Sequence, residues 1–186
     1  MISKKKAGWL LAGALSLVSS IANAEMLTFH FKGTVIYGGT LANVGDEITG
    51  HFCYDTDAGP PAIRLDNFAY YQVAPECKLV VRVGTHKATT GDLGISIWNN
   101  FGGNVEDMID VSGAGAVVDG IEYPNGTVNF QFATASGNTK IFRSVNLRER
   151  FRIEDFDAWH DGVVLMDGSQ TGTLLQFTIT SIRVVD

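Results

Sequence analysis

The chain has 186 residues, a formal net charge of −6 at pH 7, and a hydrophobic share of 45%. This length fits one domain that buries a core without help from a metal ion or from oligomerisation. The acidic balance, with no basic stripe in the sequence to offset it, argues against nucleic acid and anionic lipid as partners.

The first 24 residues have the zones of an export signal. Lys4, Lys5 and Lys6 form a basic region, an apolar run follows over 8–18, and "ANA" at 22–24 supplies the small residues of a cleavage site. The apolar run is shorter than the roughly 20 residues that span a bilayer, and no later segment comes close. The alternative, in which residues 8–21 form a buried helix, explains the order of the zones less well.

We therefore predict a signal peptide over 1–24 and a single domain over 25–186 that is secreted or periplasmic and has no membrane span. Because the leader carries three lysines and no acids, its removal would change the net charge from −6 to −9.

Period-2 alternation of apolar and polar residues recurs along the domain. Leu27, Phe29 and Phe31 share one face of the first such segment, and Thr28 and His30 share the other. By the same pattern, we predict strands over 27–35, 47–54, 78–83, 93–98, 105–111, 127–132, 162–166 and 174–180. The clusters of Gly, Asn and Asp between them predict turns over 37–46, 57–61, 99–104, 112–120, 124–126 and 167–172.

About eight to ten short strands with frequent turns predict an all-β fold, either an antiparallel β-sandwich or a jelly roll. One short helical turn is expected near residues 146–158. The last strand changes parity near Ser181, since Phe177 and Ile179 fall on one face and Ile182 and Val184 on the other. This change predicts a β-bulge.

Cys53 and Cys77 are the two cysteines of the chain. In an exported protein, such a pair favours a disulfide over a catalytic or metal-binding site. The bond would close a loop of about 25 residues, worth roughly 3 kcal/mol. Alternation places Cys53 on a polar face with His51 and Cys77 on the face of Leu79 and Val81, so a bend or a strand end is needed at one partner.

Asp55 and Asp57 stand two residues apart, as do oxygen ligands in calcium loops, and Asp66 is a candidate third ligand. The segment lacks the further regular ligands and the closing Glu of an EF-hand. The alternative is that these side chains cap a turn through nearby backbone N–H groups. We predict no required cofactor, with Ca²⁺ as an optional structural ligand.

Motifs for catalysis are absent from the sequence. The four histidines form no zinc-binding pattern, and there is no G-x-S-x-G nucleophile elbow. Asp107, Asp110, Glu154 and Asp155 are the richest supply of paired acids for glycoside hydrolysis, but their spacing has little specificity. The protein is therefore predicted not to be an enzyme.

Aromatic residues give a candidate ligand site. Alternation in 93–98 turns Trp98 away from the apolar face, next to Asn99, and one of Tyr70 and Tyr71 must face outward if that segment is a strand. Trp159 lies in a segment expected to be a polar turn. Exposed aromatics beside Asn and Asp can stack on sugar rings and bind their hydroxyls. The alternative is that Trp98 and Trp159 cover the open ends of the core.

Several strand and turn motifs resemble the small secreted β-sandwich proteins of the exosortase-sorted (PEP-CTERM) group of Gram-negative bacteria. They are "GTV" at 33–35, "VGD" at 44–46, "ITG" at 48–50, "YDTDA" at 54–58, "ISIWNN" at 95–100, "DMID" at 107–110 and "TGTLLQFTITSI" at 171–182. The resemblance implies an extracytoplasmic β-sandwich of the cell envelope or extracellular matrix and brings no catalytic residues. The chain ends at "ITSIRVVD" without the sorting motif, so free secretion or a periplasmic location is expected.

Three functions follow as hypotheses. The first is a non-catalytic protein that binds a polymer such as polysaccharide, or a protein partner, at the envelope or matrix. The second is a small extracellular carbohydrate-active hydrolase or lyase, which would gain support if Asp107, Asp110 and Trp98 lined one cleft. The third is a structural matrix subunit that self-associates through exposed strand edges.

Overall fold

A computed structural model describes residues 26–56, 59–101, 106–135, 137, 141–142, 144–147, 151–167 and 172–185. The signal peptide predicted over 1–24 lies outside these residues. Within the described ranges, no helix is long and apolar enough to cross a membrane.

The described residues form eleven strands in one antiparallel sheet, together with one 3-10 turn, η1 (Ile153–Asp155). The strands are β1 (Met26–Tyr37), β2 (Glu47–Asp55), β3 (Ile63–Leu65), β4 (Phe68–Gln72), β5 (Val80–Val83), β6 (His86–Thr89), β7 (Gly94–Phe101), β8 (Glu106–Val118), β9 (Ile121–Ala133), β10 (Trp159–Leu165) and β11 (Thr173–Val185). The predictions of an all-β fold and of a short helical turn within 146–158 are confirmed.

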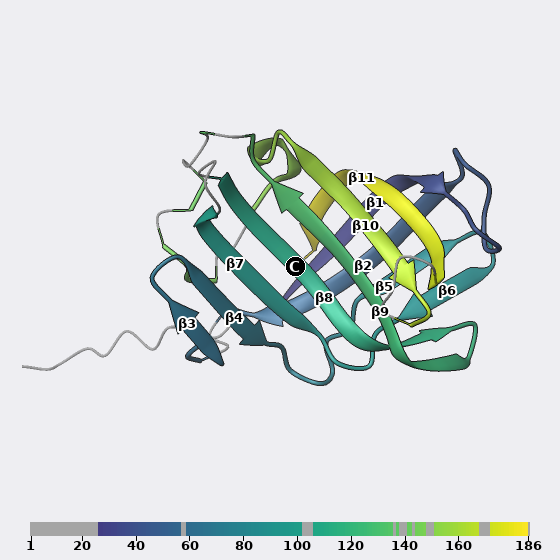
Figure 1. Cartoon of the computed structure of the whole chain (residues 1–186), viewed down its shortest axis with the longest axis horizontal. Coiled ribbons are helices and arrows are strands. Elements are labelled where there is room, and N and C mark those ends of the chain that lie inside the picture. The colour runs from purple at the N-terminus through teal and green to yellow at the C-terminus, as the bar shows by residue number, and fades with distance from the viewer. Residues whose placement is uncertain are drawn as a thin grey trace, which may run out of the picture.

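The sheet closes on itself through strand β8. Its first half pairs with β7, its end pairs with β6, and β9 pairs along both halves. The closed ring therefore runs β8-β6-β5-β2-β1-β11-β10-β9, and β7, β4 and β3 extend it sideways from β8. In Figure 1, β7 to β10 cross the front of the molecule and β1, β2 and β5 pass behind them. A two-sheet sandwich or jelly roll was too specific a prediction, because hydrogen bonding is continuous around eight strands.

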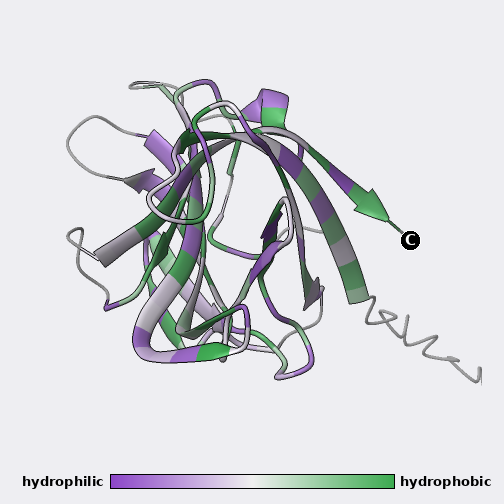
Figure 2. Cartoon of the chain, turned by 90° about the vertical axis from the view of Figure 1, so that its right-hand side faces the viewer, coloured by the Kyte–Doolittle hydropathy of each residue, from purple (hydrophilic) through white to green (hydrophobic). Residues whose placement is uncertain are grey.

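The interior of this barrel is filled by large side chains, as expected for a ring of eight strands. Phe31 and Phe52 on one wall meet Phe130 on the other, with ring centroids 5.4 and 5.2 Å apart. Gly50 lies opposite Phe31, and a Cβ atom added there would lie 2.1 Å from the phenylalanine ring. The ring thus occupies the space that a side chain at residue 50 would need. Hydrophobic and hydrophilic bands alternate along the strand that leads to the C-terminus (Figure 2).

All eight predicted strands are present, but β3, β4 and β6 were not among them, and two of the turns predicted from clusters of Gly, Asn and Asp are wrong. Strand β8 continues to Val118, and only Asp119 and Gly120, both with positive φ, make the turn into β9. Residues 124–126 lie inside β9 as a bulge opposite Gly115 (φ 68°). Proline fits there because a bulged residue need not donate to the neighbouring strand.

The predicted bulge in the last strand is confirmed. Lys32 pairs with Ser181 and Gly33 pairs with Ile179, so Thr180 is an extra residue in β11. A Cβ atom on Gly33 would lie 2.2 Å from the Thr178 carbonyl oxygen, which explains glycine at this close approach.

The predicted disulfide between Cys53 and Cys77 is confirmed, with Cα atoms 5.1 Å apart. Cys53 lies on the outward face of β2, while Cys77 is buried in the segment between β4 and β5. The opposite faces predicted for the two cysteines required a bend or a strand end at one of them, and Cys77 lies outside a strand.

Replacing both cysteines by alanine should lower the free energy of unfolding by about 3 kcal/mol, because the unfolded chain loses a covalent loop. For a chain of this size, each kcal/mol corresponds to a decrease in Tm of about 2–4 °C. Calorimetry of the double variant and of the reduced wild type should give similar decreases. Equal Tm values for the oxidised wild type and the double variant would contradict this account.

Candidate functional site

Outward-facing side chains of the front wall align in rows that cross several strands. One row is polar and follows the register from β4 to β11: Tyr70, Ser96, Asp110, Gln131, Asp161 and Thr178. The row beside it is largely apolar and contains Phe68, Trp98, Met108, Ala133 and Trp159. Adjacent members of a row lie about 5 Å apart, the spacing of neighbouring strands.

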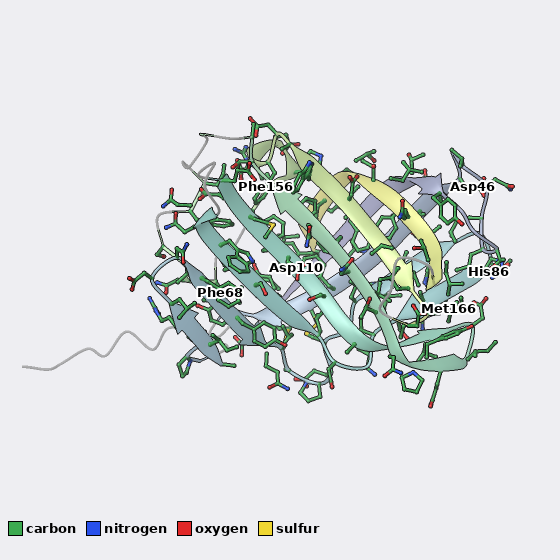
Figure 3. The ribbon with its side chains drawn as sticks, viewed as in Figure 1. Asp46, Phe68, His86, Asp110, Phe156 and Met166 are labelled. Atoms are coloured by element: carbon green, nitrogen blue, oxygen red, sulfur yellow. A yellow bond between two sulfur atoms is a disulfide. The ribbon has the colours of Figure 1, made fainter. Side chains whose placement is uncertain are left out.

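Two hollows lie along the polar row. The first has a volume of about 560 Å³ and includes Tyr70, Asp110 and Ser112 in its lining. The second, of about 330 Å³, is lined in part by Asp161 and Gln176, and both hollows share Asn129 and Gln131. We call the joined hollows the polar groove, defined by Tyr70, Gln72, Asp110, Ser112, Asn129, Gln131, Asp161 and Gln176. Figure 3 shows Asp110 near the middle of this wall.

Tyr70 forms the β4 end of the polar groove. Its ring lies over Gly94 of the neighbouring strand, where an added Cβ atom would lie 2.4 Å from the ring and the hydroxyl oxygen. Glycine at residue 94 therefore lets the tyrosine ring rest against the sheet. The position of the ring is fixed by packing, which gives a ligand a ready-made aromatic surface.

Asp110 is the buried acid of the polar groove. Although the residue is partly exposed, its Oδ1 atom is shielded from solvent and has no hydrogen-bond partner, while Oδ2 accepts a bond from the Ser112 hydroxyl at 2.9 Å. Burial raises the pKa of the Asp110 carboxyl, and the Ser112 and Gln131 side chains partly oppose this shift. A buried acid with a raised pKa in a groove is typical of a functional site.

We predict that Asp110→Asn raises Tm at neutral pH. Because the folded-state pKa lies above the unfolded value, the stabilisation by protonated Asp110 is complete below the unfolded pKa and is lost as pH rises through the folded pKa. The variant should thus match the wild type near pH 3.5 and exceed it by a few degrees at pH 7. Asp66→Asn, which removes an exposed charge, is the control. A Tm difference independent of pH would contradict the prediction.

The predicted aromatic ligand residues are only partly brought together. Tyr70, Trp98 and Trp159 all face outward, and Trp159 is 55% exposed. Trp98 packs on Phe68, with ring centroids 4.1 Å apart. Tyr71 faces the core instead, where its hydroxyl donates to the Val145 carbonyl at 3.2 Å.

Asn99 lies near the end of β7, where its backbone N–H donates to the Asn67 carbonyl and its side-chain oxygen accepts from Asn100. The segment 159–161, predicted to be a turn, is the beginning of β10 and pairs with β9.

The predicted calcium ligands are only partly visible. Asp55 is half-buried at the end of β2, and Asp66 is exposed in the turn between β3 and β4. Asp57 lies outside the described residues. Among the residues that are described, no three or more His, Cys, Asp or Glu side chains are grouped to hold a metal ion. Calcium binding stays a prediction.

Asp107 and Asp110 do not share a cleft. The Asp107 carboxylate is fully buried and accepts backbone N–H bonds from Asn100, Ile141 and Phe142 at 3.2, 2.9 and 2.8 Å. Trp98 does not line the polar groove. Of the three residues named for a catalytic cleft, the groove contains Asp110.

Sequence reasoning missed Asn129 and Gln131, the residues common to both hollows. The sequence pattern does place both residues on the outer face, because Asn129 and Gln131 alternate with Val128, Phe130 and Phe132, which are buried. The sequence does not reveal which strands flank β9, so their position beside Asp110 was not accessible.

Comparisons with family models, with curated proteins and with solved structures find no match to this chain.

Proposed function

We propose that the protein binds a polysaccharide along the polar groove and acts as a non-catalytic protein of the cell envelope or extracellular matrix. The observation that carries this proposal is the combination of an outward tyrosine ring with a row of amide and hydroxyl side chains in one groove. The polar members nearest Tyr70 are Gln72, Ser112, Asn129 and Gln131. An aromatic face can stack on a sugar ring while amides bind its hydroxyls.

The shape of the groove favours a chain over a small compact ligand. Its two hollows share Asn129 and Gln131 in their linings, and together they extend from β4 to β11. At about 5 Å per strand, this length accommodates several sugar rings in a row. A polymer of repeated hydroxyl-bearing units would find polar side chains along the whole length of the groove.

The exported location that the sequence predicts would fit this proposal. The Cys53–Cys77 disulfide is of the kind that forms and persists in oxidising compartments. A secreted or periplasmic site, together with the resemblance to PEP-CTERM proteins, favours an envelope or matrix polysaccharide as the partner.

Affinity electrophoresis against neutral polysaccharides tests the proposal. Tyr70→Ala and Gln131→Ala should each weaken retardation by about tenfold in affinity, since they remove the stacking surface and a central hydrogen-bonding group. Tyr70→Phe should retain most of the binding. Asn67→Ala, an exposed change in the β3–β4 turn, is the matched control. Equal retardation of the wild type, Tyr70→Ala and Gln131→Ala in every gel would reject the groove as the site.

Asp110 favours a second candidate function, acid-catalysed glycoside hydrolysis. Both Asp110 and Asp161 pair with Gln131, so their Cα atoms lie two strands, or roughly 10 Å, apart. Inverting glycosidases place their two carboxyl groups about 6.5–9.5 Å apart. A reducing-end assay decides between the candidates: products that vanish in Asp110→Asn, with binding retained, would establish the enzyme.

A further inference from the structure

The fold gathers positive charge on the wall opposite the polar groove. Seven lysines and arginines lie in the described part of the chain, and five of them are on this face: Lys32, Lys78, Arg82, Lys87 and Arg183. They come from β1, the segment before β5, β5, β6 and β11, so the sequence alone shows no basic stripe. The remaining two, Arg64 and Arg152, lie elsewhere.

Four of these cations line two hollows that share a pair of histidines. One hollow, of about 620 Å³, contains Lys32, Arg82 and Arg183, and the other, of about 470 Å³, contains Lys78. His30 and His51 line both and stack across β1 and β2 with ring centroids 5.5 Å apart. We call this joined surface the basic groove, defined by His30, Lys32, Thr49, His51, Lys78, Arg82, Ser181 and Arg183.

Strand register places two cations directly opposite one another beside the basic groove, because Arg82 pairs with Lys87 of β6. Arg183 pairs in the same way with His30, which carries a like charge only when it is protonated. Directly opposed like charges destabilise a sheet. The folded protein would be more stable if these cations were spread over its surface. A bound anion would offset the repulsion between them.

Acidic side chains near the basic groove neutralise little of this charge. Glu47 lies 3.8 Å from Lys32, but both side chains are more than 60% exposed, and such exposed pairs contribute little. Asp119 is engaged by His86 and by the Lys87 backbone N–H. Glu76 lines the second hollow beside Lys78.

We propose that the basic groove binds an acidic polysaccharide, whose carboxylate or sulfate groups pair with Lys32, Arg82 and Arg183. This is a second site on the wall opposite the polar groove, and it does not depend on the function proposed for that groove.

The order of side chains favours a polysaccharide over a phosphate polymer. From β11 to β5 the row reads Ser181, Lys32, Thr49 and Arg82, which alternates hydroxyls with cations, and Lys87 of β6 follows Arg82. Cations in this row are two strands, or roughly 10 Å, apart. A chain that carries occasional acid groups among many hydroxyls matches this alternation better than a nucleic acid with its dense phosphates.

The histidine pair adds a dependence on pH. Burial lowers the pKa of His51, and the charges of His30, Arg82 and Lys87 lower it further. The charged or titratable groups around His51 are His30 and Lys32 on β1, Arg183 on β11, Arg82 on β5, Lys87 on β6, and Glu76 and Lys78 before β5. A bound anion would favour protonated histidine, so affinity should increase as pH falls from 8 to 5.5.

Isothermal titration of the protein with polygalacturonate, dextran sulfate and neutral dextran tests this proposal. We expect binding to at least one acidic polymer, weakened by salt and reduced roughly tenfold or more in the Lys32→Gln, Arg82→Gln double variant. Arg64→Gln, which removes the same type of charge outside the groove, is the matched control. His51→Gln should flatten the pH dependence. Thermal melts confirm that each variant is folded.

Three results would overturn the proposal: no binding of either acidic polymer, an unchanged affinity in the double variant, or duplex DNA bound as tightly as the acidic polysaccharides. Tyr70→Ala separates the two grooves. It should leave the acidic polymers bound, even where it abolishes the binding of neutral glycan.

Discussion

Replacing Phe130 by alanine is expected to lower the free energy of unfolding by about 3–5 kcal/mol. Phe130 is fully buried on β9 and its ring lies 5.2 to 5.4 Å from those of Phe31, Phe52 and Phe132. The contacts with Phe31 and Phe52 join opposite walls of the closed ring, and Phe132 is a neighbour on the same strand. The substitution leaves a cavity that the surrounding strands, held by their hydrogen bonds, cannot close.

Urea unfolding followed by circular dichroism measures this loss, and Phe130→Leu serves as a milder variant if the alanine variant does not fold. Phe68→Ala is the matched control, because Phe68 faces outward and packs on half-buried Trp98. We expect a clearly smaller loss there. Equal losses at residues 68 and 130 would mean that the phenylalanines inside the ring do not form the stabilising core.

Replacing Asp107 by alanine is the second change with a large expected effect, about 3 kcal/mol or more. The Asp107 carboxylate accepts three backbone N–H bonds, two of them from Ile141 and Phe142. The backbone of Asp107 also exchanges bonds with Thr134. Alanine would leave these backbone N–H groups without hydrogen-bond partners. The folded state would then lose stability by the free energy needed to remove the N–H groups from water.

Asp107→Asn separates the hydrogen bonds from the shape of the side chain. It keeps the volume but loses the charge and one acceptor, so we expect an intermediate loss of stability. Asp46→Ala is the control, because Asp46 is exposed and accepts one backbone bond, from Asn43. Denaturant unfolding of the three variants should rank Asp107→Ala as the most destabilised. A loss in Asp107→Ala no greater than in Asp46→Ala would contradict this role.

Local pattern was enough to predict much of the fold. The parity change between Phe177 and Ile182 predicted a bulge near Ser181, because side chains alternate strictly along a strand, and the structure has the extra residue at Thr180. The opposite parities of Cys53 and Cys77 correctly required a strand end at one of them. Both inferences use only neighbours in the chain.

The closure of the sheet and the composition of the grooves could not be predicted in this way. Closure of the sheet depends on the pairing of β6 with β8 and of β1 with β11, which are not consecutive in the chain, and periodicity does not encode such pairs. The same limit hid the row that contains Lys32 and Arg82. The pairing of Asp110 with Gln131 was hidden because 112–120 and 124–126 were predicted to be turns and not parts of the β8–β9 hairpin. Short β3 and β6 were missed because three or four residues give too few alternations to detect.

Mapping polysaccharide fragments onto the protein by amide chemical shifts tests the central claim most directly. Neutral fragments should shift the amides of Tyr70, Asp110, Asn129 and Gln131, while amides that flank buried Phe31 and Phe52 should stay unchanged. Shifts confined to other surfaces, or none with any fragment at millimolar concentration, would contradict the assignment of the polar groove as a polysaccharide site.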